Sequence, residues 1–275
     1  MQNKRITKAE TALPEGTMNY YRLKKGRKPF VMLHGRMENG LCWSRVAETI
    51  EGDFDVYMPD IRGHGATNLA DREISITVLL DDIISFIESL NLSNPVLMGH
   101  SMGAGIAALY AAAHPGNVTA LILSDPPWLL KKDYIDGDIS LVKKMQNVIR
   151  TNKSLSLNTL SAYIHFSNQH WDTRDCRLLA QAWKEARELV AFSYNSPVPY
   201  AQWENNVKKI NCPVLLLTSN PRKGGILTPR SVRHIKNLYP RIVHEHFPTA
   251  GHAIMRDTFV PYVQAINNFI LQKLS

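Results

Sequence analysis

The feature that most restricts the fold of this 275-residue chain is the segment Gly99-His100-Ser101-Met102-Gly103. It follows an apolar run, residues 95–98, that predicts a buried strand, and it precedes residues 104–109, whose small and apolar side chains predict a helix. A sharp strand-to-helix turn needs small residues around its centre, and this segment supplies two glycines. The turn would expose the Ser101 hydroxyl at the carboxyl edge of a sheet, beside the N–H groups of a helix start. We therefore predict that Ser101 is a nucleophile, the alternative being a purely structural turn.

The rest of the chain alternates short β-rich runs with longer helical patterns, which indicates a mostly parallel sheet built from crossover units. The first two runs follow each other without a helix, so we expect the sheet to begin as an antiparallel ribbon. The fold class is therefore α/β, with helices on both faces of the sheet. The predicted strands span residues 18–23, 29–33, 54–58, 95–98, 118–123, 213–218 and 242–247, and the predicted core helices span residues 41–50, 76–90, 102–114, 229–238 and 258–274.

The central part of the chain, residues 128–203, interrupts this alternation because its pattern is entirely helical. We interpret it as a helical cap inserted into a core formed by residues 1–127 and 204–275. Most of its aromatic side chains are expected to pack within the cap. Pockets favour the boundaries between such units, so Trp128 is expected to face the substrate pocket. The predicted cap helices span residues 139–149, 156–166 and 177–192.

Composition argues against several classes of protein. The net charge of +8 comes from basic residues scattered in short pairs, without the aromatic-lined stripe of a nucleic-acid binder, so we expect no nucleic-acid partner. Residues 1–16 are polar and lack the apolar region of a secretory signal, and no apolar run is long enough to span a bilayer. The three cysteines are widely spaced and predict neither a disulfide framework nor a zinc site. We expect a soluble, cytoplasmic protein with no membrane partner, and the sequence gives no indication of its oligomeric state.

The general base that a serine nucleophile needs is expected at His252. This residue follows Gly251 in a loop after the last predicted strand and before the final predicted helix. Of the other histidines, His34, His64 and His100 lie within backbone motifs and are expected to form structural hydrogen bonds. The remaining histidines have no comparable context.

Together with the serine segment, three further segments resemble the α/β-hydrolase superfamily: Leu33-His34-Gly35, residues 59–65 (PDIRGHG) and Gly251-His252. The resemblance runs from about residue 20 to residue 269 and is weakest in the predicted cap. It implies an eight-stranded, mostly parallel, twisted sheet with the cap inserted after the sixth strand. It says much less about the substrate, because this fold supports many reactions.

The resemblance also implies the two backbone donors of an oxyanion hole, which are the N–H groups of Arg36 and Met102. An arginine side chain is unusual at position 36. We expect it to point outward and to pair with Glu38, with contact to an acidic substrate as the alternative.

The acidic member of the triad departs from the family pattern. Most members carry it after the seventh strand, but residues 213–244 contain no carboxylate. Asp125 ends the predicted strand next to the one that carries Ser101, and the two prolines that follow restrict its backbone. Since some members place their acid at this strand end, we expect Asp125 to complete the triad, with a loop-capping role as the alternative. Asp60 and Asp257 are expected to be structural, the latter as a cap of the final helix.

These residues predict a serine hydrolase that cleaves a carboxylic ester, or a lactone or thioester, of a small molecule through an acyl-enzyme on Ser101. No metal or organic cofactor is implied. Cleavage of a C–C bond, acyl transfer and aminopeptidase activity use the same triad and stay open as alternatives. Outside enzymes, the alternative is a ligand receptor that keeps this fold and hydrolyses little.

Overall fold

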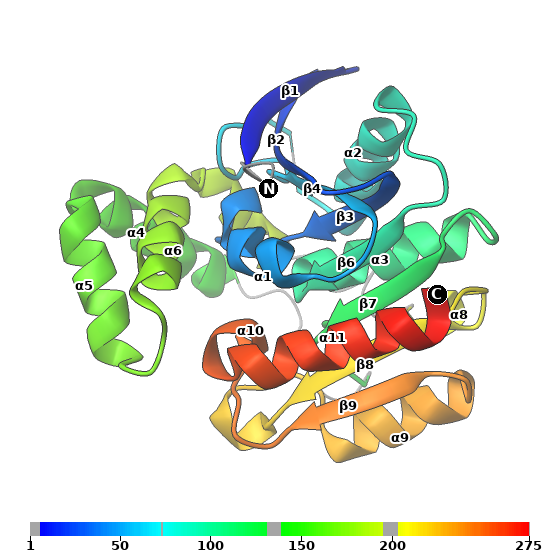
Figure 1. Cartoon of the computed structure of the whole chain (residues 1–275). Helices are drawn as coiled ribbons and strands as arrows, with labels where there is room; N and C mark the ends of the chain where they lie inside the picture. Colours follow the sequence, from blue (N-terminus) through cyan, green and yellow to red (C-terminus); the bar gives the residue numbers. More distant parts are fainter. Residues whose placement is uncertain (1–5, 73, 131–138, 195–202, 275) are drawn as a thin grey trace.

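The computed structural model of the protein describes residues 6–72, 74–130, 139–194 and 203–274. Within them, one open sheet has eight main strands in the order β1-β2-β4-β3-β6-β7-β8-β9, and the short strand β5 pairs with β2 (Figure 1). All strands from β4 to β9 along this order are parallel. The predicted α/β class and the mostly parallel sheet are therefore confirmed. The strands are β1 Thr7–Leu13, β2 Gly16–Lys24, β3 Lys28–Leu33, β4 Phe54–Pro59, β5 Asn68–Leu69, β6 Val96–His100, β7 Ala120–Ser124, β8 Val214–Ser219 and β9 Val243–Phe247.

The sheet begins with antiparallel strands, as predicted, but the partners differ from those expected. The second strand, β2, pairs with β1 and β4 rather than with β3, which follows it in the chain. Sequence reasoning missed β1 because this edge strand has a largely exposed surface and therefore few apolar residues.

The two faces of the sheet carry two separate apolar cores. One core contains residues of α2, α3 and α9, and the other contains residues of α1 and α11. The strands between them are almost completely buried, which explains their continuous apolar runs. Helices therefore cover both faces, as predicted. The helices of this part are η1 Gly40–Trp43, α1 Ser44–Thr49, α2 Ile76–Ser89, α3 Met102–Ala113, α8 Trp203–Val207, η4 Pro221–Lys223, α9 Pro229–Leu238, α10 Ile254–Asp257 and α11 Phe259–Leu274.

The described residues between β7 and β8 form helices and connecting loops without a strand, and we refer to residues 139–194 as the helical insertion. It contains α4 Ile139–Ser154, α5 Leu157–Ser167, α6 Thr173–Glu185 and η3 Glu188–Tyr194. Figure 1 shows α4, α5 and α6 to one side of the sheet. The continuous helix expected over residues 177–192 is wrong: α6 ends at Glu185, the ψ of 132° at Ala186 leaves the helical region, and a 3₁₀ turn follows. No helix in the described residues has the length and apolarity that a membrane span requires.

Candidate functional site

The turn around Ser101 has the strained geometry that its glycines allow. Ser101 precedes α3 with φ 51° and ψ −116°, a conformation that non-glycine residues rarely adopt. A Cβ on Gly99 would lie 2.3 Å from the carbonyl carbon of Gly103, and a Cβ on Gly103 would lie 2.1 Å from the carbonyl oxygen of Leu33. Neither glycine can be replaced without moving α3 away from the sheet. This close packing presents Ser101 at the carboxyl edge, where the sequence predicted it.

Asp125 lies beside this turn, at the end of the neighbouring strand β7. The backbone N–H of Ser101 donates to the carbonyl of Ser124 (2.9 Å), so the two strand ends are in direct contact. The Asp125 side chain is completely buried, and its backbone also has a positive φ of 44°. Its carboxylate accepts hydrogen bonds from the Ser219 hydroxyl (3.0 Å) and from the N–H groups of Ile226 (2.9 Å) and Leu227 (3.4 Å). All these partners donate, so both oxygens of the side chain act as acceptors.

His252 meets Asp125 from the loop after β9. Its Nδ1 lies 2.7 Å from Asp125 Oδ2. A carboxylate can only accept here, so Nδ1 carries the proton and Nε2 is the basic nitrogen. Burial lowers the pKa of His252, and the nearby His100 lowers it further, against the opposing effect of Asp125. The imidazole is therefore neutral near neutral pH and able to accept a proton.

Sequence reasoning missed Ser219, which donates to the same Asp125 oxygen as His252. Ser219 is the last residue of β8 and lies directly before the loop in which the family resemblance places the acid. Here that loop supplies donors to a carboxylate on the adjacent strand instead of the carboxylate itself. A hydroxyl at this strand end is the signal that could have indicated it.

The two residues expected to form the oxyanion hole lie on adjacent segments. Met102 begins α3, and the close contact of Gly103 with the Leu33 and His34 carbonyls brings the loop that contains Arg36 next to this helix start. Arg36 is partly buried and helps to lower the pKa of His64, so its charge lies near that ring. The outward pair of Arg36 with Glu38 is wrong. Glu38 turns inward, is 4% exposed and binds Gly35, His100 and Arg256, because a buried carboxylate needs donors that solvent cannot supply.

Asp60 is structural, as predicted. Its carboxylate accepts from the Asn19 side chain (2.7 Å) and from the N–H groups of Gly40 (2.7 Å) and Ala66 (2.8 Å). Burial raises its pKa to about 6 against these donors, so it is ionised at neutral pH.

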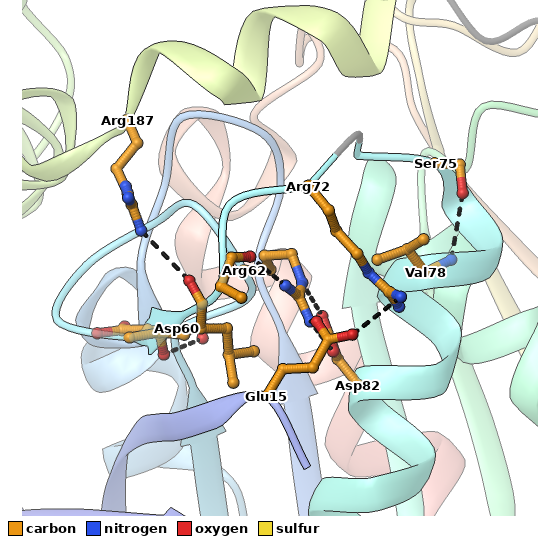
Figure 2. A network of polar contacts seen from close by, with 11 residues as sticks. Glu15, Asp60, Arg62, Arg72, Ser75, Val78, Asp82 and Arg187 are labelled. Atoms are coloured by element: carbon orange, nitrogen blue, oxygen red, sulfur yellow. Dashed lines mark hydrogen bonds and ion pairs between the residues drawn. The ribbon is translucent and has the colours of Figure 1, made fainter. Parts of the chain in front are cut away.

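The same PDIRGHG segment contains a second buried charge, Arg62. Its guanidinium lies 2.7 Å from the carboxylates of Asp82 and Glu15. Figure 2 shows these contacts. Arg72 also binds Glu15, at 2.9 Å. This network joins the segment after β4 to α2 and to the turn before β2, so the charges of the motif hold the scaffold together.

The expected capping role of Asp257 is wrong. Asp257 is the last residue of α10, and the final helix begins only at Phe259. Its Oδ2 accepts from the N–H of Gly251 (2.7 Å), and its Oδ1 accepts from the indole of Trp171 (2.6 Å) and lies 2.9 Å from His170 Nε2. Asp257 therefore connects the loop that carries His252 to the helical insertion.

Trp128 is buried (2% exposed) and stacks on Trp203, with ring centroids 5.4 Å apart. The two rings line a narrow cavity against α3 together with Gly105 and Ala108, one and two turns beyond Ser101. Its contact with a substrate stays a prediction.

Comparisons with known proteins agree with this architecture. Residues 28–257 match the family model described as alpha/beta hydrolase fold. The chain is 25% identical to the N-formylmaleamate deformylase of Pseudomonas putida over 250 residues, 87% of each protein. The solved structure of an E-2-(acetamidomethylene)succinate hydrolase has a TM-score of 0.77 and 18% identity, and covers 97% of this chain and 99% of its own. An esterase from Exiguobacterium antarcticum has a TM-score of 0.75 and 19% identity, with coverage of 96% and 100%. At these identities the two structures show a common fold only.

Proposed function

Since the chain belongs to the alpha/beta hydrolase fold family, we propose that it is a serine hydrolase with Ser101, His252 and Asp125 as its catalytic triad. The bond that it cleaves is a carboxylic ester, lactone or thioester of a small molecule. The observation that carries this proposal is the 2.7 Å contact between His252 Nδ1 and the buried, fully hydrogen-bonded carboxylate of Asp125. A carboxylate held in this way orients an imidazole and stabilises the imidazolium that forms during acyl transfer.

The reaction follows from the roles of these groups. Ser101 Oγ attacks the carbonyl carbon of the substrate while His252 Nε2 takes its proton. The N–H groups of Arg36 and Met102 stabilise the tetrahedral oxyanion, at about 3 kcal/mol for each donor. His252 then protonates the leaving group, and the acyl group stays on Ser101. Water activated by His252 attacks this acyl-enzyme and releases the acid.

The helical insertion, with the segments that join it to the core, is proposed to act as a cap over this site, spanning residues 128–203. The bonds of Asp257 to Gly251 and Trp171 support a link between this unit and the catalytic loop. Trp128, at the start of the unit, is proposed to contribute to the acyl pocket.

Hydrolysis of a small N-acyl amide is the second candidate. It is favoured by the likeness, over 87% of the chain, to a protein named as a deformylase of N-formylmaleamate. The same triad attacks an ester and an amide, but an amine leaves less readily and needs protonation by His252.

The experiment is a comparison of wild type with Ser101→Ala on p-nitrophenyl esters from acetate to octanoate and on p-nitroformanilide and p-nitroacetanilide. We expect ester hydrolysis that falls with acyl length and disappears in the variant. Faster turnover of the anilides than of the esters would establish the second candidate. Hydrolysis that persists in Ser101→Ala would contradict both.

A further inference from the structure

A buried ionic cluster lies beside the candidate triad, and none of the roles assigned above uses it. It consists of Glu38, His100 and Arg256, each at most 6% exposed, from the loop after β3, the end of β6 and α10. Glu38 Oε1 lies 2.7 Å from Arg256 Nη1, and Glu38 Oε2 lies 3.3 Å from His100 Nδ1. The other nitrogen of His100, Nε2, lies 3.0 Å from the carbonyl oxygen of His252. The cluster thus reaches the backbone of the proposed general base.

The other two buried histidines of the sequence motifs, His34 and His64, form the hydrogen bonds expected of a neutral imidazole ring. His34 Nε2 accepts from the N–H of Ile61 (2.9 Å), and its Nδ1 faces the Gly35 carbonyl (2.8 Å). His64 Nε2 accepts from the N–H of Met37 (3.2 Å), and its Nδ1 faces the Arg62 carbonyl (3.0 Å). Each ring therefore has one donating and one accepting nitrogen, as a neutral imidazole requires.

His100 differs because both of its nitrogens face groups that can only accept. A neutral ring would direct a lone pair either at the carboxylate of Glu38 or at the carbonyl of His252. We infer that Glu38 holds His100 as an imidazolium, and that this cation is a positioning residue that fixes the backbone of His252 and keeps the His252 ring neutral. This inference rests on the proposed function for its catalytic meaning, but the charge of His100 can be measured without it.

The charges around the cluster are consistent with this assignment. Glu38 faces two cations, Arg256 and His100, and also accepts from the N–H of Gly35 (2.8 Å). Their positive charge holds the pKa of Glu38 well below its usual range despite burial. The neighbouring Cys42 thiol and Tyr262 hydroxyl stay protonated at neutral pH, since burial raises the pKa of each. Asp175, which also acts on Arg256, is paired with Arg45 at 2.8 Å.

The consequence for His252 is a change in its basicity. The rings of His100 and His252 are 4.6 Å apart between centroids. A cation at this distance disfavours a second cation, so it opposes protonation of His252 in the free enzyme. Asp125 and Glu38 act in the opposite direction, and Asp125 has the greater effect of the two. Burial has the largest effect and also lowers the pKa of His252, so together with the His100 cation it keeps this ring neutral and available as a base at neutral pH.

The first test is the pH profile of His100→Gln. A glutamine amide can still donate to the His252 carbonyl but has no charge. We expect the acid limb of kcat/KM to move up by about one pH unit, because a neighbouring cation no longer opposes protonation of His252. His114→Gln is the matched control, since His114 bonds a carbonyl at the far end of α3, and it should leave the limb in place. A limb that does not move in His100→Gln, whatever the loss in kcat, would overturn the inference.

The second test does not need a substrate. The NMR spectrum of ¹⁵N-histidine-labelled protein is recorded at pH 7, and the signals of His100 are identified by their loss in His100→Gln. We expect this ring to show two N–H protons and the nitrogen chemical shifts of an imidazolium. Glu38→Gln should abolish that pattern. A single N–H on His100 would overturn the inference even if Ser101 reacts with a fluorophosphonate. Failure of Ser101 to react, with the imidazolium present, would refute the proposed function alone.

Discussion

At the scale of single residues, the Oδ2 atom of Asp125 accepts three hydrogen bonds, from His252, Ser219 and the N–H of Ile226. The carboxylate reaches this position from β7 because the neighbouring strand end supplies both a hydroxyl and N–H groups. An acid on this strand can therefore take the place of one after β8. The residue that distinguishes this arrangement is Ser219, whose hydroxyl lies at the end of β8, the strand after which the family resemblance places the acid.

Replacing Ser219 by alanine should weaken the orientation of Asp125 without removing its charge. A hydrogen bond to a charged group contributes about 2 kcal/mol, so we expect kcat/KM to fall about thirtyfold, with KM little changed. Thr218→Val is the matched control, because the Thr218 hydroxyl bonds His244 and His246 rather than Asp125. Equal activity of Ser219→Ala and Thr218→Val in a steady-state assay would show that the Ser219 bond does not matter.

At the scale of elements, α3 and β3 approach each other through Gly103. The contact places the start of the helix against the loop that carries Arg36, so the two proposed oxyanion donors depend on it. A second contact between separate elements involves Asp257, which connects the loop that carries His252 to Trp171 in the helical insertion. The site is thus assembled from contacts between the ends of separate elements.

Gly103→Ala should disturb both stability and the site, since the new Cβ would meet the Leu33 carbonyl at 2.1 Å. We expect a loss of about 2–3 kcal/mol in the free energy of unfolding, measured by urea denaturation, and a fall in kcat larger than any change in KM. The control is Gly116→Asn: Gly116 has a φ of 88° with nothing within 4 Å of an added Cβ, and asparagine tolerates this backbone. Wild-type stability of Gly103→Ala would refute the close contact.

At the scale of the whole molecule, buried ionisable groups make stability depend on pH. Burial lowers the pKa of His34 to about 4 and that of His64 to about 3, from about 6.5 in an unfolded chain. Between the pKa of the unfolded chain and the lower pKa of the folded state, each histidine binds a proton in the unfolded state but not in the folded state. The free energy of unfolding therefore falls as the pH falls. Asp60 has the opposite effect below its raised pKa of about 6, because there the folded state holds the extra proton.

His34 and His64 against Asp60 leave the unfolded state with about one extra proton between pH 6 and 4, and the partly buried His244, whose pKa burial lowers to about 4, adds to this excess. We therefore expect the free energy of unfolding to decrease by about 3 kcal/mol between pH 6.5 and 4.5, measured from urea midpoints at each pH. His64→Gln should make this decrease smaller, since one of the titrating groups is gone. A stability that is flat or rises on acidification would contradict the buried, neutral state of these rings.

Local patterns were sufficient to predict most of the fold. Apolar and β-rich runs identified the strands β2, β3, β4, β6, β7, β8 and β9 but not the two-residue strand β5, and glycines near Ser101 and His252 identified two candidate site residues. Asp125 was predicted from its place at a strand end, where some family members carry the acid, and from the absence of a carboxylate in residues 213–244. The sequence could not indicate Ser219 or the turn of Glu38 toward His100, because those bonds join segments far apart in the chain. The edge strand β1 was missed for a different reason, since an exposed strand leaves no apolar run.

The measurement that tests the central claim most directly is the rate at which a fluorophosphonate labels the protein, with the labelled residue identified by peptide mass. We predict a single adduct on Ser101, its absence in Ser101→Ala, and a rate lower by orders of magnitude in Asp125→Asn, in which the imidazole loses the carboxylate that fixes its tautomer. A label on another residue, no label at all, or a near wild-type rate in Asp125→Asn would contradict the triad of Ser101, His252 and Asp125.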